Sequence, residues 1–143
     1  MCQLKRHLKR PKKGYKIVVL KGYKKYSPAM GIEYEDGEPV KIPKKQHKLA
    51  KLYSSKILDP KAGHGFSQHM VGRTAIFKDS RDAWDLFWRM KNSLMVLGWN
   101  CVSTPMALFE ATVSTDVMSG VSSKNSKIKV YAGRVISFGE RLY

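Results

Sequence analysis

The order of apolar and polar positions predicts short strands in the first part of the chain. Residues 15–21, YKIVVLK, are a β-branched apolar run between two glycines, which is typical of a buried strand. The next segment, KKYSPAMG, predicts a short strand that Pro28 ends, because proline cannot donate a hydrogen bond to a sheet. Residues 32–42 alternate apolar and acidic side chains around Asp36-Gly37, a dipeptide typical of hairpin turns.

The middle of the chain predicts one more strand and the main helix. Residues 70–77 are the strand, and residues 78–99 are the helix. Asp79 or Ser80 can cap the N-terminus of the helix, and Gly98 is placed to end it. Most of its positions are apolar, so we expect it to pack on two sides, or against a sheet and a partner. Its polar side chains form one narrow stripe: Asp82, Asp85, Arg89 and Asn92.

The last part of the chain predicts two further strands, one at residues 106–114 and one within residues 127–143, which can pair with each other. The fold class that follows is α+β: a mostly antiparallel sheet with the one main helix packed on one face. We predict a basic N-terminal arm at residues 1–14 and a single domain at residues 15–143. Residues 43–69 lose periodicity and gain Gly, Pro and Lys, which predicts a mobile lysine-rich loop.

Length and composition agree with one globular domain. The chain has 143 residues, of which 43% are apolar, enough for a single hydrophobic core. The two cysteines, Cys2 and Cys101, do not form a disulfide framework or a zinc spacing, which favours a reducing compartment or the interior of an assembly. No segment has the length of a membrane span or the pattern of a secretory signal.

Charge is the strongest compositional signal. The formal net charge is +16, and residues 1–61 carry 17 Lys or Arg against 5 acids. A positive field of this kind favours association with polyanions, without sequence specificity. The side chains that we expect to neutralise phosphates are Lys5, Arg6, Lys9, Arg10, Lys12 and Lys13 in the arm and Lys44, Lys45, Lys48 and Lys51 in the loop.

Aromatic residues offer two further candidate contacts. Tyr23, Tyr26 and Tyr53 lie among lysines, as on a surface where bases stack while phosphates are neutralised, or else they are strand residues that point inward. Trp84 and Trp88 lie one helical turn apart, which places them either in the core or on an exposed face that contacts a partner.

Candidate catalytic chemistry is weak. His64 and His69 flank a glycine-rich loop, but no Cys, Asp or Glu completes a metal-ligand spacing, so partner contact or no role is favoured over a metal or a catalytic function. Cys101 has apolar neighbours, as a small buried residue does. The four acids of residues 33–38 are typical of a solvated hairpin tip. Because phosphate-loop, zinc-protease and nucleophile-elbow motifs are absent, we predict no enzyme, no metal and no cofactor.

One resemblance bears on origin. The succession YKIVVLKGYKKYSPAMGIEY, DGEPVKIP, GRTAIFKDSRDAW, ALFEATVS and KIKVYAGRVISF resembles an uncharacterised small α+β domain family of phages and large DNA viruses. The resemblance covers roughly residues 15–138, and the arm and the lysine-rich loop lie outside the usual compact form of that family. It implies an α+β fold and a viral origin, and it implies no activity or catalytic residues.

Three functions are compatible with the sequence. The first hypothesis is a non-enzymatic, virus-type basic protein that contacts nucleic acid, or an assembly rich in nucleic acid, through its N-terminal half. The second is a structural or assembly protein, such as a minor capsid component, whose basic arm threads between neighbouring subunits of the virion. The third is a small inhibitor of a host defence enzyme. Partners are therefore nucleic acid or other subunits of a viral assembly.

Overall fold

The computed structural model describes residues 2–28, 32–41, 72–92, 95–96, 99–100, 106–122 and 127–143. Its N-terminal strands are β1 (Gln3–His7), β2 (Lys12–Lys21), β3 (Lys24–Tyr26), β4 (Glu33–Tyr34) and β5 (Glu38–Pro39). After them come β6 (Thr74–Phe77), the helix α2 (Ser80–Asn92), and the short strands β7 (Met95–Val96) and β8 (Trp99–Asn100). The C-terminal strands are β9 (Met106–Ser114), β10 (Met118–Val121), β11 (Lys129–Gly133) and β12 (Val135–Arg141).

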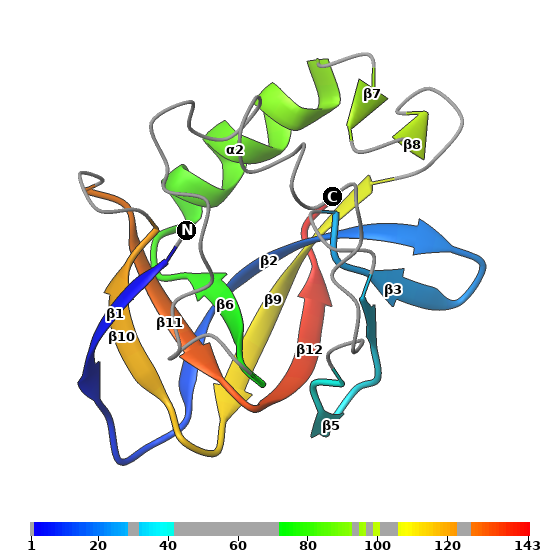
Figure 1. Ribbon diagram of the computed structural model, residues 1–143. Helices are drawn as coiled ribbons and strands as arrows, with labels where there is room; N and C mark the ends of the chain where they lie inside the picture. The colour runs from blue at the N-terminus through cyan, green and yellow to red at the C-terminus, as the bar shows by residue number, and fades with distance from the viewer. Residues whose placement is uncertain are drawn as a thin grey trace.

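Ten of these strands form one antiparallel sheet, which confirms the predicted fold class (Figure 1). Its main path runs β1-β10-β11-β6-β2-β9-β12-β5, while β3 joins β2 and β4 joins β3. The strands β7 and β8 pair only with each other. The central strand β2 pairs along most of its length with β9, from Lys12 opposite Val113 to Val19 opposite Met106. Strands far apart in the sequence therefore lie side by side.

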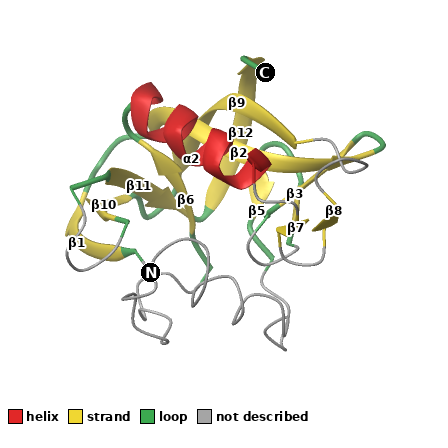
Figure 2. Cartoon of the chain, turned by 90° about the horizontal axis from the view of Figure 1, so that it is seen from above, coloured by secondary structure: helices red, strands yellow, loops and turns green. Residues whose placement is uncertain are grey.

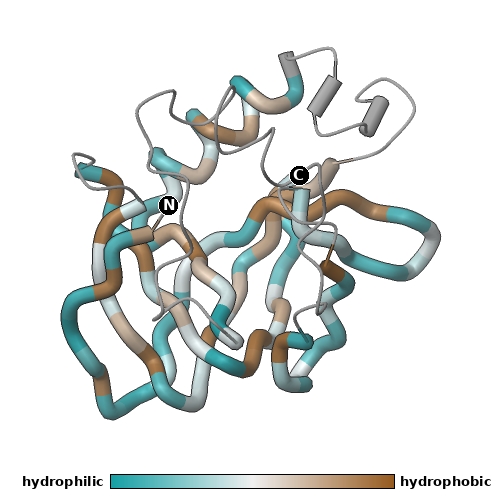
Figure 3. The backbone as a smooth tube through the Cα atoms, viewed as in Figure 1, coloured by the Kyte–Doolittle hydropathy of each residue, from teal (hydrophilic) through white to brown (hydrophobic). Residues whose placement is uncertain are grey.

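The strand β2 is apolar at successive positions because both of its faces are covered. Ile17 and Val19 pack against the helix, whereas Val18 belongs to a second buried cluster on the other face. A strand buried on both faces has a continuous apolar run instead of strict alternation. Figure 3 shows this run as the hydrophobic second half of β2, in contrast with the hydrophilic tube along β1. The predicted buried strand at residues 15–21 is confirmed.

The helix α2 covers one face of the sheet, over β2 and β9 (Figure 2). Ala83, Phe87 and Met90 recur at helical spacing and are buried against Ile17 and Leu108. The predicted helix was too long, because α2 ends at Asn92 and β7 and β8 follow it. The helix ends at Asn92, and asparagine is a residue type with low helix propensity.

On the other face, the sheet curves around a second apolar cluster that includes Val18, Ile76, Val113 and Ile136 (Figure 1). Gly14 permits this curvature, since a Cβ at that position would lie 2.2 Å from the carbonyl oxygen of Phe77. The concave face therefore has an apolar centre, and the polar end of the same face, beyond Gly14, is open to solvent.

The N-terminal residues do not form a separate arm. Residues 3–7 are the edge strand β1, which pairs with β10, so the predicted independent arm is not confirmed. Leu4 is 5% exposed and packs with Met118 and Val130. Residues 3–7 join the sheet because β10, in the Ser-rich segment, provides a partner strand. The two strands come close to each other at Gly120.

One predicted strand pairing is wrong, and one is confirmed. The Asp36-Gly37 turn forms, with Gly37 at a φ of 75°. The strand before the turn, β4, pairs with β3, and the strand after it, β5, pairs with β12. The two flanking strands do not pair with each other, so the segment is not a hairpin. The predicted pairing of residues 106–114 with the C-terminal segment is confirmed, because β9 pairs with β12, although residues 127–143 form two strands, β11 and β12. The strand at residues 106–114 is confirmed, and the predicted strand at residues 70–77 appears as β6.

Candidate polyanion-binding groove

The strand order brings distant basic residues to the concave face of the sheet. Register places Arg6 of β1 opposite Ser119, Ser119 opposite Tyr131, and Tyr131 opposite Ile76. Two strand positions further along, and so on the same face, the amide of Lys78 donates to the carbonyl of Lys129 at 3.0 Å. Side chains from three separate parts of the chain therefore share one surface.

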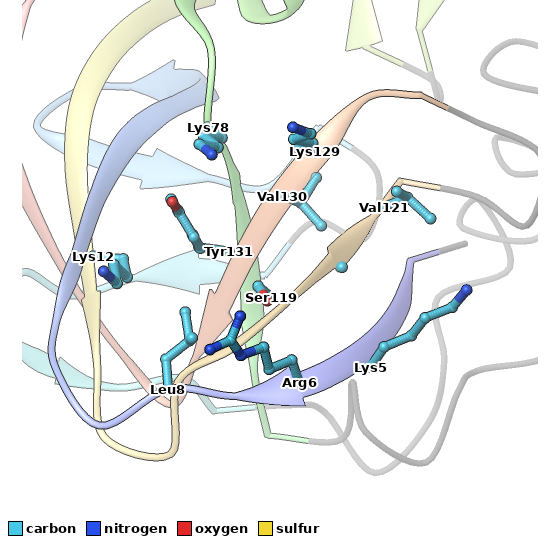
Figure 4. Close-up of a pocket in the computed structure, with 11 residues that line it drawn as sticks. Lys5, Arg6, Leu8, Lys12, Lys78, Ser119, Val121, Lys129, Val130 and Tyr131 are labelled. Atoms are coloured by element: carbon cyan, nitrogen blue, oxygen red, sulfur yellow. The ribbon is translucent and has the colours of Figure 1, made fainter.

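This surface is hollowed into a groove of about 500 Å³, which we call the basic groove (Figure 4). None of the described residues that line it is acidic. Figure 4 shows Lys78 and Lys129 at one end, Arg6 and Lys5 at the other, and Lys12 at the side. The lining consists of Lys5, Arg6, Leu8, Lys12, Lys78, Ser119, Gly120, Val121, Lys129, Val130 and Tyr131.

A β-bulge explains why two adjacent cations both line the groove. Neighbouring residues of a regular strand point to opposite faces, so Lys5 and Arg6 could not normally share one. The register of β1 shifts between Leu4 and Arg6, which leaves Lys5 as the extra residue. Bulges re-aim side chains in this way. The bulge therefore adds one cation to the basic groove.

The cations of the basic groove have no anionic partner within the described part of the chain. The ion pairs formed there are Lys24 with Glu33 and Arg134 with Asp116, both away from the groove. Five like charges around one hollow repel each other and raise the local positive potential. An anion that enters the groove would relieve this repulsion.

Tyr131 supplies the aromatic surface of the basic groove. The ammonium nitrogen of Lys12 lies 5.9 Å from the centre of the Tyr131 ring. The ring is partly exposed, and Figure 4 shows it between Lys12 and the cations of β1 and β11. Cations surrounding an aromatic ring are typical of sites that hold a phosphate and an adjoining base.

The structure places only some of the predicted phosphate contacts in the basic groove. Lys5, Arg6 and Lys12 line it. Lys9 and Arg10 are exposed in the turn between β1 and β2, and Lys13 is exposed on β2, outside the lining. The sequence prediction missed Lys78, Lys129 and Tyr131. The predicted contacts Lys44, Lys45, Lys48 and Lys51 lie outside the described residues.

The predicted stacking tyrosines do not line the basic groove. Tyr23 is fully exposed at the turn between β2 and β3. Tyr26 packs against the cluster under the helix, which is the inward orientation that the sequence left open. Tyr53 lies outside the described residues. The groove's aromatic residue is Tyr131 instead.

The two tryptophans lie on the helix side of the sheet. Their rings stack with centres 6.4 Å apart. Trp84 packs against the core cluster, which is the first of the two predicted environments. Trp88 is 43% exposed, and its predicted contact with a partner stays a prediction. Tyr143 packs edge-on against both rings, and the ammonium of Lys91 lies 4.2 Å from the centre of the Tyr143 ring. The cluster binds the C-terminus to α2.

A second polar group lies inside the concave face. Lys16 donates to the carbonyl oxygen of Ala75 at 2.8 Å, and its ammonium is 5.3 Å from the centre of the Tyr34 ring. The Thr74 hydroxyl lies 3.1 Å from the Tyr34 hydroxyl. Burial alone would raise the pKa of Tyr34, but the charge of Lys16 and the hydrogen bonds to Thr74, Ser27 and Lys16 outweigh it and lower that pKa. These contacts satisfy the buried polar atoms.

A third polar cluster carries its own counter-ion. The Nε of Arg73 donates to the carbonyl oxygen of Asp116 at 2.8 Å, and the Nε of Arg134 donates to the Asp116 carboxylate at 2.9 Å. Burial and the nearby Arg134 lower the pKa of Arg73, while Asp116 opposes that shift. Unlike the basic groove, this cluster has its anion in place.

The remaining candidate residues add no site. His64, His69 and Cys101 lie outside the described residues. Within the described ranges, no three His, Cys, Asp or Glu side chains come together as metal ligands. Burial raises the pKa of the Cys2 thiol. Among the described residues, no helix has the length and apolar character that crossing a bilayer requires.

No protein-family model, curated protein or solved structure matches this chain. The resemblance to small domains of phages and large DNA viruses therefore stays a prediction.

Proposed function

We propose that this protein binds nucleic acid through the basic groove, without sequence specificity and without catalysis. The observation that supports the proposal is the convergence of five cations, from β1, β2, β11 and the end of β6, on one hollow whose described lining contains no acid. Lysine and arginine neutralise phosphates and release condensed counterions, which supplies binding energy for any sequence. In the setting that the viral resemblance implies, the protein acts in the host cytoplasm or the virion.

The assembly alternative loses its main structural support. It required residues 1–14 to thread between subunits, but residues 3–7 are paired with β10 and Leu4 is buried. Threading would have to detach β1 and expose Leu4. A host enzyme inhibitor would use the same cationic surface, and a competition experiment with nucleic acid would reveal it.

Salt dependence tests the proposal. We expect a fluorescently labelled strand to bind with a log–log salt slope of about −3.5 to −4.5, the value for five neutralised phosphates. Affinity should then fall roughly 100- to 500-fold from about 50 to 200 mM salt. An affinity that does not change over this range would refute phosphate neutralisation by the groove.

A matched pair of variants separates the groove from net charge. Replacing Lys12, Lys78 and Lys129 by Gln should reduce the slope to about −1.4 to −1.8, since three phosphate contacts are lost. The control variant replaces Lys21, Lys41 and Arg81 by Gln, which removes the same charge from exposed positions outside the groove lining. Equal losses in both variants would show that net charge, and not the groove, carries binding.

Copurification offers an independent check. The ratio of absorbance at the nucleic-acid and protein maxima, measured before and after nuclease treatment, should fall on digestion for the native protein. It should start lower for the groove variant than for the control variant. A nuclease-insensitive ratio in all three proteins would contradict the proposal.

A further inference from the structure

We infer that the preferred ligand of the basic groove is a single-stranded nucleic acid, one base of which stacks on Tyr131. This inference rests on the proposed function and narrows its substrate class. The groove has a volume of about 500 Å³ and is a local hollow on the concave face of the sheet. Its ligand must therefore bend into the hollow or present a narrow group to it.

Shape favours the single strand. Duplex DNA is stiff over about 150 base pairs and meets a protein with a convex surface. Such a surface can contact cations on the rim of the groove, such as the exposed Lys5 and Lys78, but it cannot bring a base down to Tyr131. A single strand turns at every phosphate, so a base and its neighbouring phosphates can enter together.

The chemistry of the lining also favours an unpaired base. The side chain of Tyr131 lies within the groove, and the ammonium of Lys12 is already 5.9 Å from the centre of its ring. An incoming base would take the place of that ammonium on the ring, and Lys12 would then pair with the phosphate of the same nucleotide. The cation changes partner and keeps an attractive contact.

The groove cannot read a base sequence. Direct readout uses several side chains such as Asn, Gln or Arg aimed at base edges in a fixed frame, and of these residue types the described lining contains Arg6 alone. Apart from the cations and Tyr131, Ser119 is the one lining side chain with a hydrogen-bonding group among the described residues. Stacking on one ring tolerates every base, because every base has a π-face. The inferred ligand is therefore single-stranded but not sequence-defined.

Three probes of the full chain test the inference. They are an oligothymidylate of about 12 nucleotides, an abasic strand of the same length and charge, and a duplex of that length. We expect the oligothymidylate to bind about 5- to 140-fold more tightly than the abasic strand, which corresponds to the 1 to 3 kcal/mol typical of one stacked base. We also expect it to bind more tightly than the duplex at equal salt.

Variants locate the effect at the ring. Tyr131→Leu should bring the ratio of oligothymidylate to abasic affinity close to one and leave the salt slope as it was, because no phosphate contact is removed. Tyr131→Phe keeps the ring and should restore most of that ratio. Tyr23→Leu is the matched control, since Tyr23 is fully exposed and outside the groove lining, and the ratio should not change.

The outcomes distinguish the two proposals. Equal, salt-dependent affinity for all three probes would overturn the inference while the proposed function stands. Tighter binding of the duplex would also overturn it. Failure of every probe to bind at about 50 mM salt would refute the proposed function and the inference together. The comparison of probes uses the unaltered protein, so a variant that fails to fold does not remove the test.

Discussion

Replacing Leu4 by Ala should detach β1 and dismantle one end of the basic groove. Leu4 is 5% exposed and packs against Met118, Val130 and Ala132, and it is the one fully buried side chain of the five-residue strand β1. The cations Lys5 and Arg6 follow it directly. Their position in the groove therefore depends on an apolar contact made by their neighbour.

The expected magnitude follows from the size of that contact. A buried Leu→Ala substitution costs about 2 to 5 kcal/mol, and an edge strand that can readjust belongs at the lower end, about 2 to 3 kcal/mol. This cost is comparable to the stability of a single edge strand, so the strand can open without global unfolding. An opening equilibrium shifted by this amount changes roughly 30- to 140-fold.

Hydrogen exchange measures the opening at a defined amide. The Leu8 amide donates to the carbonyl of Val117 at 2.8 Å at the end of β1. In Leu4→Ala, the protection of the Leu8 amide should fall by roughly 30- to 140-fold, while amides in the centre of β2, such as that of Val18, should lose less protection. The salt slope for nucleic acid should also become shallower by about 1.4 to 1.8, because two phosphate contacts are lost.

Gln3→Ala is the control for this prediction, since Gln3 lies on the same strand and is exposed. Its effect on stability should stay within about 0.5 kcal/mol. Unchanged Leu8 protection together with an unchanged salt slope in Leu4→Ala would refute the reasoning. Loss of protection with an unchanged slope would show that β1 opens but contributes no phosphate contact.

Two further predictions concern the concave face. Gly14→Ala should destabilise the protein by at least about 1 kcal/mol, because the added Cβ would lie 2.2 Å from a backbone oxygen. Urea unfolding followed by tryptophan fluorescence measures this change, and an unaltered midpoint would contradict the close approach. Lys16→Met should raise the pKa of Tyr34, observed by ultraviolet titration, since the ammonium lowers it. Because the pKa of Tyr34 is lowered in the folded protein, ionisation of Tyr34 stabilises the fold only above the ordinary pKa range of tyrosine. This stabilisation is lost as the pH falls through the pKa of the folded state, so it is absent at neutral pH.

The elements that could be predicted are those whose signal is local. The strand at residues 106–114 is an apolar run with both faces covered, and its bounds match β9. The helix begins at Ser80, as its capping residues indicated. By contrast, β1 contains one buried residue, and β10 has the sequence MSGV within a Ser-rich segment. Neither has an alternation strong enough to stand out, because the edge strand β1 and its neighbour β10 each have one buried residue.

Pairing was less predictable than the strands themselves. The Asp36-Gly37 turn was visible in the sequence, but its two flanking strands find partners from other parts of the chain. A turn dipeptide determines how the chain bends locally, and the wider sheet determines which strand lies beside it. The segment at residues 127–143 was expected to form one strand, but it divides at Arg134 into β11 and β12, which join different neighbours.

The basic groove was predictable only in part for the same reason. Charge density in the first residues pointed to Lys5, Arg6 and Lys12. Lys78, Lys129 and Tyr131 become their neighbours through the order β1-β10-β11-β6-β2, which no local pattern contains. Lys129 alternates with apolar residues as any half-exposed strand residue does. Its role depends on which strand lies beside it.

The charged residues of β1 also suit its position at the edge of the sheet. An edge strand with unpaired backbone groups tends to pair with a second copy, and proteins prevent this with charged side chains and bulges. In β1, residues 5–7 are exposed and basic or titratable, and the register shift lies between Leu4 and Arg6. Two copies meeting edge to edge would bring these charges together and repel. An anionic ligand meets no such barrier, so the features that prevent self-association are the same ones that supply the basic groove with Lys5 and Arg6.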